Sequence, residues 1–363
     1  MRYVIDKSSL MENAQIINKI AGSVPVIGVV KGNGYGLGTV RFAEVLVECG
    51  IGVLAVACIE EAQALRGAGI TLPILLLTPP ANADIAASIV SLELIAAIDS
   101  HAGAQLLDTA AKAKQVKAKA HIKIDTGLGR YGFLPGETNN IIDVYNSFDS
   151  IDFTGIYAHF SSSFAKNSES VDGQLKKFLA VTQFLESAGF DCGVKHIANS
   201  SAALLSPAAH LDCVRIGSAF LGRLAVPNVY GLHKIGFMEC EIAAIKDLPK
   251  NHNIGYGDAY KTKKPVRIAI IPIGHTHGFG VEKRKDCFRL RDVVRYILND
   301  IKLLFGREKL YCRIGGEQVP VIGRIGLTHT AVDISGVACE LGDIAVFEIN
   351  PLQVDAWVER VLL

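Results

Sequence analysis

The sequence predicts an α/β protein in which an N-terminal (β/α)8 barrel of the TIM type is followed by a C-terminal β-rich domain with an inserted helix. Three observations support this prediction. Short apolar runs recur through the first two thirds of the chain, segments with helical spacing separate most of them, and strand-like runs dominate from about residue 233. We therefore expect a barrel domain over residues 1–232 and a β domain over residues 233–363, which the first few residues would join.

Eight buried strands are expected in the barrel because eight apolar runs alternate with helical segments. The runs occupy residues 26–30, 53–57, 74–77, 94–98, 118–124, 153–158, 194–197 and 211–216. Helical spacing is clearest over residues 40–48, 60–66, 102–113 and 175–187. A doubly wound open sheet is the main alternative, but the loop GNGYGLG after the first run lacks the phosphate-turn pattern of that fold, and Glu48 ends a helix rather than a strand.

The second domain is predicted from strand-like runs separated by glycine and proline. These runs occupy residues 240–245, 266–273, 319–322, 330–334 and 344–349. Residues 290–305, LRDVVRYILNDIKLLF, instead place apolar side chains at helical spacing and predict an inserted helix. We expect this helix to pack on its own domain, with a role at a subunit interface or at the site entrance as the alternative.

Composition and charge exclude several classes of protein. The formal net charge is +1 and no basic block occurs, so neither nucleic acid nor an anionic membrane surface is an expected partner. No apolar run reaches the length of a membrane span, and the N-terminus MRYVIDKSSLMENAQ has no signal-like region. The eight cysteines form no C-x-x-C pair, so neither a disulfide framework nor a zinc site is expected, and a cytoplasmic protein fits best.

Polar residues follow the predicted barrel strands at the ends where barrel enzymes place their sites. They are Lys31 and Tyr35 after the first strand, Lys123 and Arg130 with the fifth, His159 after the sixth, His196, Asn199 and Ser200 after the seventh, and Arg215 and Gly217 at the eighth. Two lysines, two arginines and two histidines with little acid predict an anion site. Ser200 and the amides near Gly217 fall where barrels commonly bind phosphate.

Lys31 is the most informative of these residues because it ends an apolar strand. Such a lysine either extends into water or is desolvated, in which case its pKa falls and its amine becomes nucleophilic. An amine that faces a phosphate-bearing ligand suggests a Schiff base with pyridoxal 5′-phosphate (PLP).

Seven motifs then occur in a recognisable order between about residue 25 and residue 326: VVKGNGYG, HIKIDTGLGRYGF, GIYAHF, HIANSSA, VRIG, IGYG and VIGRIG. In these motifs the chain resembles the alanine racemase family of fold-type III PLP-dependent amino-acid racemases. The resemblance implies an isomerase of amino-acid metabolism that uses PLP and forms a homodimer with shared active sites.

The resemblance also implies roles for individual residues. Lys31 would form the Schiff base and act as one proton-transfer base, and Tyr256 from the partner subunit would be the opposing base. Arg215 would donate to the pyridine nitrogen of PLP. The cofactor would further contact Tyr35, His159, Asn199, Ser200, Gly217 and Ser218. Arg130 would face the substrate carboxylate, and Lys123 corresponds to a family lysine that can be carbamylated, which would create an anion able to hold Arg130.

Three departures from the family pattern concern the substrate side. His275, in GHTHG, stands where the family usually has a tyrosine, and Leu327 follows Gly323-Arg-Ile-Gly where the family has a methionine-aspartate pair. The chain also ends in WVERVLL without the family's closing tyrosine segment. His275 and Leu327 are therefore candidate substrate contacts, and the pocket should be larger. His275 and His277 would share a face of a strand, but with no third ligand in sight no metal is expected.

Two readings of function remain. The substrate of a racemase could be alanine or a larger or polar amino acid such as serine or lysine. A protein that binds PLP for homeostasis or regulation, without racemase turnover, is the alternative from another class. The second domain and Tyr256 argue against the alternative, because a carrier needs no opposing base.

Overall fold

The computed structural model describes residues 1–163, 169–224, 226–281, 290–304 and 310–363, without the side chains of residues 302–304. The chain divides into two compact units. Unit 1 consists of Met1–Asp6 and Gly236–Leu363, and unit 2 consists of Lys7–Ile235.

Unit 2 contains eight parallel strands in two sheets of four. One sheet has the order β4-β3-β2-β9 and the other the order β5-β6-β7-β8. The strands are β2 (Val26–Val29), β3 (Val53–Val56), β4 (Ile74–Leu76), β5 (Ala96–Ile98), β6 (Ala118–Lys123), β7 (Ile151–Tyr157), β8 (Val194–His196) and β9 (Val214–Ile216). Each lies on one of the eight apolar runs of the sequence.

Backbone hydrogen bonds join the two sheets at both edges. Between β4 and β5, the amide of Ile95 donates to the carbonyl of Ile74 at 2.8 Å. Between the ends of β8 and β9, the amide of Arg215 donates to the carbonyl of Ala198 at 3.0 Å. The eight strands therefore close into a barrel, which confirms the predicted fold of this unit.

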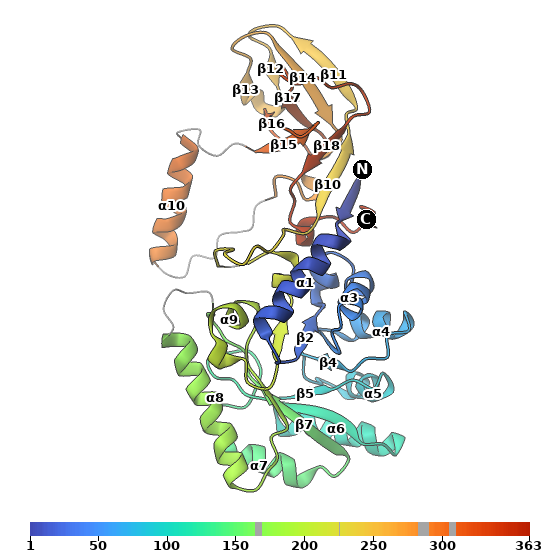
Figure 1. Cartoon of the computed structure of the whole chain (residues 1–363), viewed down its shortest axis with the longest axis vertical. Helices are drawn as coiled ribbons and strands as arrows, with labels where there is room; N and C mark the ends of the chain where they lie inside the picture. The colour runs from blue at the N-terminus through green and yellow to red at the C-terminus, as the bar shows by residue number, and fades with distance from the viewer. Residues whose placement is uncertain (164–168, 225, 282–289, 305–309) are drawn as a thin grey trace. The chain divides into compact units, whose positions relative to one another are not determined.

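Helices alternate with the strands of unit 2, and the longer ones lie on the outside of the barrel (Figure 1). They are α1 (Lys7–Ala21), α2 (Lys31–Tyr35), α3 (Thr39–Glu48), α4 (Ile59–Gly67), α5 (Ala83–Ser91), α6 (His101–Lys114), α7 (Thr138–Ser147), α8 (Glu169–Ser187) and α9 (Ser200–Leu205). Gly28 in β2 explains how closely α3 packs, since a Cβ at this position would lie 2.9 Å from Leu46 Cδ1. Inside the barrel, Ile27, Val29 and Leu75 form part of a buried cluster.

Unit 1 is built on a nine-stranded sheet with the order β11-β14-β17-β16-β15-β18-β10-β1-β19. Its strands are β1 (Arg2–Ile5), β10 (Phe237–Glu241), β11 (Ala244–Leu248), β14 (Val266–Ile271), β15 (Tyr311–Ile314), β16 (Glu317–Ile322), β17 (Thr330–Asp333), β18 (Ile344–Phe347) and β19 (Arg360–Leu362). The N-terminal strand β1 pairs antiparallel with β10 and parallel with β19. A separate hairpin, β12 (Asn253–Ile254) and β13 (Tyr260–Lys261), precedes β14.

Two details of the sequence prediction for this unit are wrong. Residues 240–245 form parts of two strands, because the amide of Ile242 bonds to Asp343 while that of Ala243 bonds to Ile270, a different strand. His275 and His277 lie in a short 3-10 helix, His275–His277, and not on a strand.

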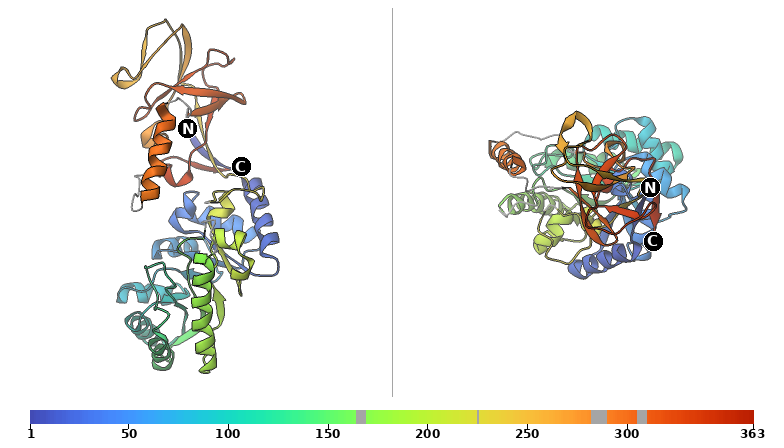
Figure 2. Two further views of the ribbon diagram at one scale, coloured as in Figure 1. Left: turned by 90° about the vertical axis from the view of Figure 1, so that its left-hand side faces the viewer. Right: turned by 90° about the horizontal axis from the view of Figure 1, so that it is seen from above.

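The inserted helix is present as α10 (Leu290–Leu304), and residue 305 lies outside the described residues. Figure 2 shows α10 outside the strands of unit 1. Most of its described apolar side chains are exposed, with Leu290 at 80%, Ile297 at 52% and Leu298 at 56%. The expectation that α10 packs its apolar side on its own domain is therefore wrong for these residues. Among the described helices, none has the length and apolar character needed to cross a membrane.

Candidate active site

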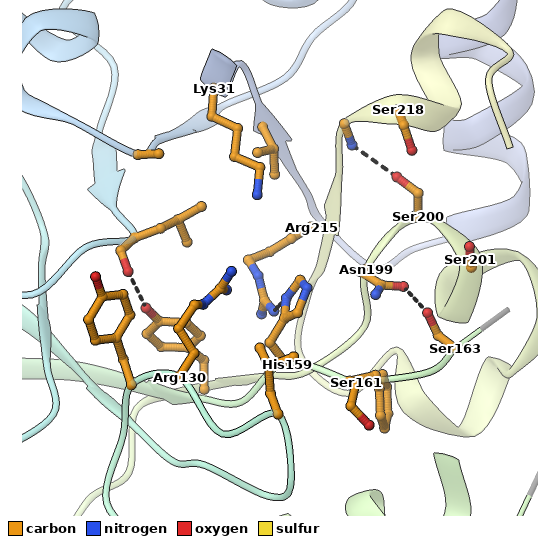
Figure 3. A pocket seen from close by; sticks show the side chains of 18 of the residues that line it. Lys31, Arg130, His159, Ser161, Ser163, Asn199, Ser200, Ser201, Arg215 and Ser218 are labelled. Carbon is orange, nitrogen blue, oxygen red and sulfur yellow. Dashed lines mark hydrogen bonds between the residues drawn. The ribbon is translucent and has the colours of Figure 1, made fainter. Parts of the chain in front are cut away.

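A cavity of about 550 Å³ opens at the carboxyl ends of the barrel strands (Figure 3). Its lining includes the ten residues of unit 2 to which the family resemblance assigns a role: Lys31, Tyr35, Lys123, Arg130, His159, Asn199, Ser200, Arg215, Gly217 and Ser218. The wall is completed by uncharged side chains, among them Leu77, Thr78, Leu128, Tyr131, Tyr157, Phe160, Ser161 and Ser163. The barrel topology therefore brings together residues that are far apart in the sequence.

Lys31 lies two residues after the end of β2 and points into the cavity in Figure 3. Burial lowers the pKa of its amine, and the nearby positive charges of Arg130 and Arg215 lower it further. After Lys31 the backbone makes a left-handed turn, with φ of 66° at Gly32, 52° at Asn33 and 61° at Gly34. The glycines of this loop permit a turn that L-residues rarely make. The lowered pKa of Lys31 favours the neutral amine, which nucleophilic attack requires.

A cradle of hydroxyl and amide groups lies opposite Lys31. Ser200 Oγ accepts hydrogen bonds from the amides of Gly217 at 3.1 Å and Ala219 at 3.4 Å. Gly217 has no room for a side chain, because a Cβ there would lie 2.2 Å from Tyr35 Oη. Asn199 Oδ1 caps α9 by accepting from the amide of Ala202. The amides of Gly217 and Ala219 thus hold the Ser200 hydroxyl in place at the start of α9, and this hydroxyl together with that of Tyr35 suits a phosphate group.

Arg215 is buried and held by five contacts. Its NH2 donates to the carbonyls of Ala158 at 2.7 Å and Ile197 at 3.3 Å. The same guanidinium approaches His196 Nδ1 at 2.6 Å and His159 Nδ1 at 3.2 Å, and it lies 5.1 Å from the centre of the Tyr157 ring. Since arginine only donates, the Nδ1 atoms of both histidines must accept, so both imidazoles are neutral.

Burial and the positive charge of Arg215 support this protonation state. They lower the pKa of His159 to about 2 and that of His196 well below its usual value. His196 is fully buried, and its Nε2 lies 2.9 Å from His121 Nδ1. The expectation that His196 lines the mouth of the barrel is therefore wrong. It supports Arg215 from behind the cavity wall.

Lys123 is a buried lysine in contact with two aromatic rings. Its Nζ lies 5.4 Å from the centre of the Tyr131 ring and 5.1 Å from that of Tyr157. Burial, with the positive charges of Arg130 and Arg215, lowers its pKa to about 8. The uncharged amine, which reaction with an electrophile requires, is therefore more populated near neutral pH than in an exposed lysine.

The loop that carries Arg130 is fixed by Asp125. The Asp125 carboxylate accepts from the amides of Gly127 at 2.9 Å, Leu128 at 2.8 Å and Gly129 at 2.9 Å. These bonds outweigh the effect of burial and lower the pKa of Asp125, so the carboxylate is charged and orders the loop before Arg130.

The cavity is cationic as a whole. Lys31, Lys123, Arg130 and Arg215 line it, and no aspartate or glutamate is among the lining residues that the structure describes. In the described part of the chain, none of the four forms an ion pair with a carboxylate. Buried cations of this kind call for an anionic ligand. The amine, the phosphate cradle and the buried arginine together fit PLP, with positive charge remaining for a carboxylate.

The remaining candidates lie in unit 1. Tyr256 is in a short 3-10 helix, Tyr256–Asp258, and its side chain is 74% exposed. His275 is exposed, and its Nδ1 lies 3.2 Å from the carbonyl of Phe279. Leu327 is exposed, and its carbonyl accepts from Thr276 Oγ1 at 2.8 Å. Among the described residues, no group of histidine, cysteine or acidic side chains is arranged to bind a metal ion.

Sequence reasoning missed three residues around the cavity. Tyr157 lies inside a predicted strand, and only the fold shows that its ring contacts both Lys123 and Arg215. His121 was hidden in the apolar run of β6. Glu61, in α4, accepts from the amide of Asn33 in the loop after Lys31, and its pattern in the sequence is that of an ordinary helix surface.

Comparison with known proteins identifies relatives over the whole chain. Residues 5–224 match the family model "Alanine racemase, N-terminal domain", and residues 237–361 match "Alanine racemase, C-terminal domain". Alanine racemase 2 of Caldanaerobacter subterraneus is 32% identical over 95% of this chain and 84% of its own, and the alanine racemase of Clostridium perfringens is 33% identical over 97% and 87%.

Solved structures give the same result. The alanine racemase of Clostridium difficile has a TM-score of 0.86 and 26% identity, covering 100% of this chain and 95% of its own. That from a D-cycloserine-producing Streptomyces lavendulae has a TM-score of 0.85 and 26% identity, covering 100% and 96%. The chain therefore belongs to the alanine racemase family of PLP-dependent amino-acid racemases.

Proposed function

We propose that this protein inverts the α-carbon of an amino acid by a two-base mechanism, with Lys31 and Tyr256 as the bases. The observation that carries the proposal is the cationic cavity, in which Lys31 has a lowered pKa and faces a phosphate cradle. Inversion needs one group that removes the α-proton and another, on the opposite face, that returns it. A PLP carrier would need the lysine and the cradle but no second base.

PLP would be bound by residues of the cavity. Lys31 would attach it covalently through Nζ. The phosphate of PLP would be held by Ser200, Gly217, Ser218 and Tyr35. Asn199 would support this cradle through the start of α9. His159 would pack against its ring. The chemistry that PLP supplies when bound is an electron sink, which acidifies the α-proton of the amino acid.

Arg215 sets the electronic character of the site. A guanidinium stays charged, so it donates a hydrogen bond to a pyridine nitrogen without giving up a proton. Because the His159 and His196 imidazoles beside it are neutral acceptors, they hold Arg215 in place and do not protonate the ring nitrogen in its stead. This arrangement restrains electron withdrawal and favours proton return at the α-carbon over side reactions.

The substrate would be alanine or a larger or polar amino acid, and alanine is the first candidate because the relatives are alanine racemases. Arg130 would bind its carboxylate. Carbamylation of Lys123 would give an anion that orients Arg130, which the low pKa of this lysine supports. His275 and Leu327, which replace a tyrosine and a methionine-aspartate pair of the family, would contact the substrate side and leave room for a larger or polar amino acid such as serine or lysine.

Tyr256 would reach the site of a second copy. Its side chain is exposed on unit 1. A residue that completes the site of another subunit must be exposed when one chain is considered alone. We therefore propose a homodimer with shared active sites, working in the cytoplasm.

The proposal is tested by chiral chromatography after incubation of the PLP-loaded protein with each L-amino acid of a panel that includes alanine, serine and lysine. We expect one or a few amino acids to approach a racemic mixture, and Lys31→Ala to lose both this activity and the visible absorbance of covalently bound PLP. A yellow wild-type protein that racemises no amino acid of the panel would favour the carrier.

A further inference from the structure

Glu61 links two strand ends beside Lys31. Its Oε1 accepts from the amide of Asn33 at 3.1 Å, in the loop that follows Lys31. Its Oε2 accepts from the amide of Ala57 at 2.9 Å, directly after β3. One carboxylate from α4 therefore joins the rims of β2 and β3 beyond the last bond of their ladder, which is donated by Val30 to Ala55.

The loop held in this way is unusual. From Gly32 to Gly36 every residue has a positive φ, including the non-glycine residues Asn33 at 52° and Tyr35 at 53°. A left-handed turn costs energy at each L-residue and persists only where its surroundings enforce it. Two hydrogen bonds that involve side chains enforce this conformation at Asn33: its amide donates to Glu61, and its Oδ1 accepts from the amide of Thr39 at 3.2 Å.

Glu61 also faces Lys31 electrostatically. The charged groups that act on the Lys31 amine are Arg130 and Arg215, which lower its pKa, and Glu61, which raises it. The negative charge of Glu61 thus partly offsets the effect of the two arginines on the pKa of Lys31. Its neighbour Glu60 is exposed and bonds to its own backbone and to Cys58, so the two adjacent glutamates differ in what they contact.

We propose that Glu61 is a positioning residue that fixes the loop carrying Lys31 and Tyr35 and holds the Lys31 amine within the cavity. The inference rests on the proposed role of Lys31. It deepens that role by assigning the placement of the amine to a carboxylate outside the cavity lining.

The test compares Glu61→Gln and Glu61→Asp with the matched control Glu60→Gln, each as the full-length protein without cofactor. Hydrogen–deuterium exchange is followed in the amides of residues 32–38, with strand Ala118–Lys123 of the same molecule as an internal reference. Gln can accept only one of the two amides, and Asp is too short to span both. We expect exchange in residues 32–38 to rise about tenfold in both Glu61 variants, as loss of one charge-assisted bond implies. The reference strand and the Glu60 control should not change.

A second readout separates charge from geometry. The rate at which added PLP becomes covalently linked to the apoprotein is measured against pH. Glu61→Gln removes a negative charge that raises the pKa of Lys31, so the midpoint of this profile should move to lower pH, whereas Glu61→Asp should keep the wild-type midpoint.

Unchanged exchange in both Glu61 variants would overturn the proposal. An equal rise in the reference strand would overturn it too, because the effect would then be global. Neither exchange result depends on turnover, so a protein that lacks racemase activity but shows the local loosening would refute the proposed function and leave the role of Glu61 standing.

Discussion

Gly217→Ala offers a direct test of the phosphate cradle. A Cβ at this position would lie 2.2 Å from Tyr35 Oη and 2.6 Å from Tyr35 Cε2 and Cζ. Carbon atoms in ordinary contact are about 3.5–4.0 Å apart, so the Tyr35 ring must move by more than about 1 Å. Its backbone sits in the left-handed loop, which leaves it little freedom to follow.

Overpacking of this kind costs about 1–3 kcal/mol. If the displaced hydroxyl is a phosphate ligand, this cost appears as a loss of affinity for PLP of roughly 5- to 150-fold. The assay is titration of the apoprotein with PLP, followed by absorbance. Gly136→Ala is the matched control, because a Cβ there meets nothing within 4 Å.

A double-variant cycle locates the effect. In a Tyr35→Ala background the added methyl has no ring to displace, so Gly217→Ala should weaken PLP binding far less than it does in the wild type. Wild-type affinity in the single Gly217→Ala variant would refute the cradle. An undiminished loss in the Tyr35→Ala background would refute the reasoning from the Tyr35 contact.

Three further predictions concern charge. Incubation with ¹³C-bicarbonate should give a carbamate resonance. The variant Lys123→Met should lack this resonance and have a raised KM for the amino acid, and a resonance that persists in the variant would exclude Lys123 as its source. Arg215→Glu should let the pyridine nitrogen of bound PLP be protonated and raise transamination relative to racemisation, and an unchanged ratio of pyruvate to D-alanine formed from L-alanine would contradict the role given to Arg215. His121 has a pKa of about 4 in the folded protein and 6.5 in the unfolded chain. Between pH 6.5 and pH 4 the unfolded chain therefore binds more protons, and the free energy of unfolding should fall as the pH is lowered, by about 2 kcal/mol at about pH 5. Denaturant unfolding at pH 7 and pH 5 measures this loss, which should shrink in His121→Gln; an equal loss in both proteins would show that other groups carry it.

The sequence predicts the barrel well because short apolar runs alternate with helical segments, and five of the eight runs lead into polar residues. Lys31, His159 and Arg215 could be placed at one rim from that pattern alone. Residues that support the rim from within the core could not be identified from this pattern. His196 looks like another rim residue in the sequence, yet β8 directs it into the core, where it meets Arg215 and His121.

Other features depend on contacts that periodicity does not encode. Glu61 has the spacing of a surface helix residue, and only the register of α4 against the loop after β2 shows its function. The strands of unit 1 were less well predicted because the chain changes partner within residues 240–245, where one apolar run serves β10 and β11 in turn. The role of Tyr256 rests on the family resemblance.

The two-base mechanism is tested most directly by following α-proton exchange in D2O by NMR, separately for the L- and D-forms of the best substrate, in the Tyr256→Phe variant. Tyr311→Phe, at another exposed tyrosine of unit 1, is the control and should match the wild type. With Lys31 intact, one enantiomer should still exchange, while exchange from the other should fall by about 10²- to 10⁴-fold, the usual contribution of a general acid–base group. Equal residual rates from both enantiomers would contradict the assignment of Lys31 and Tyr256 to opposite faces of the substrate.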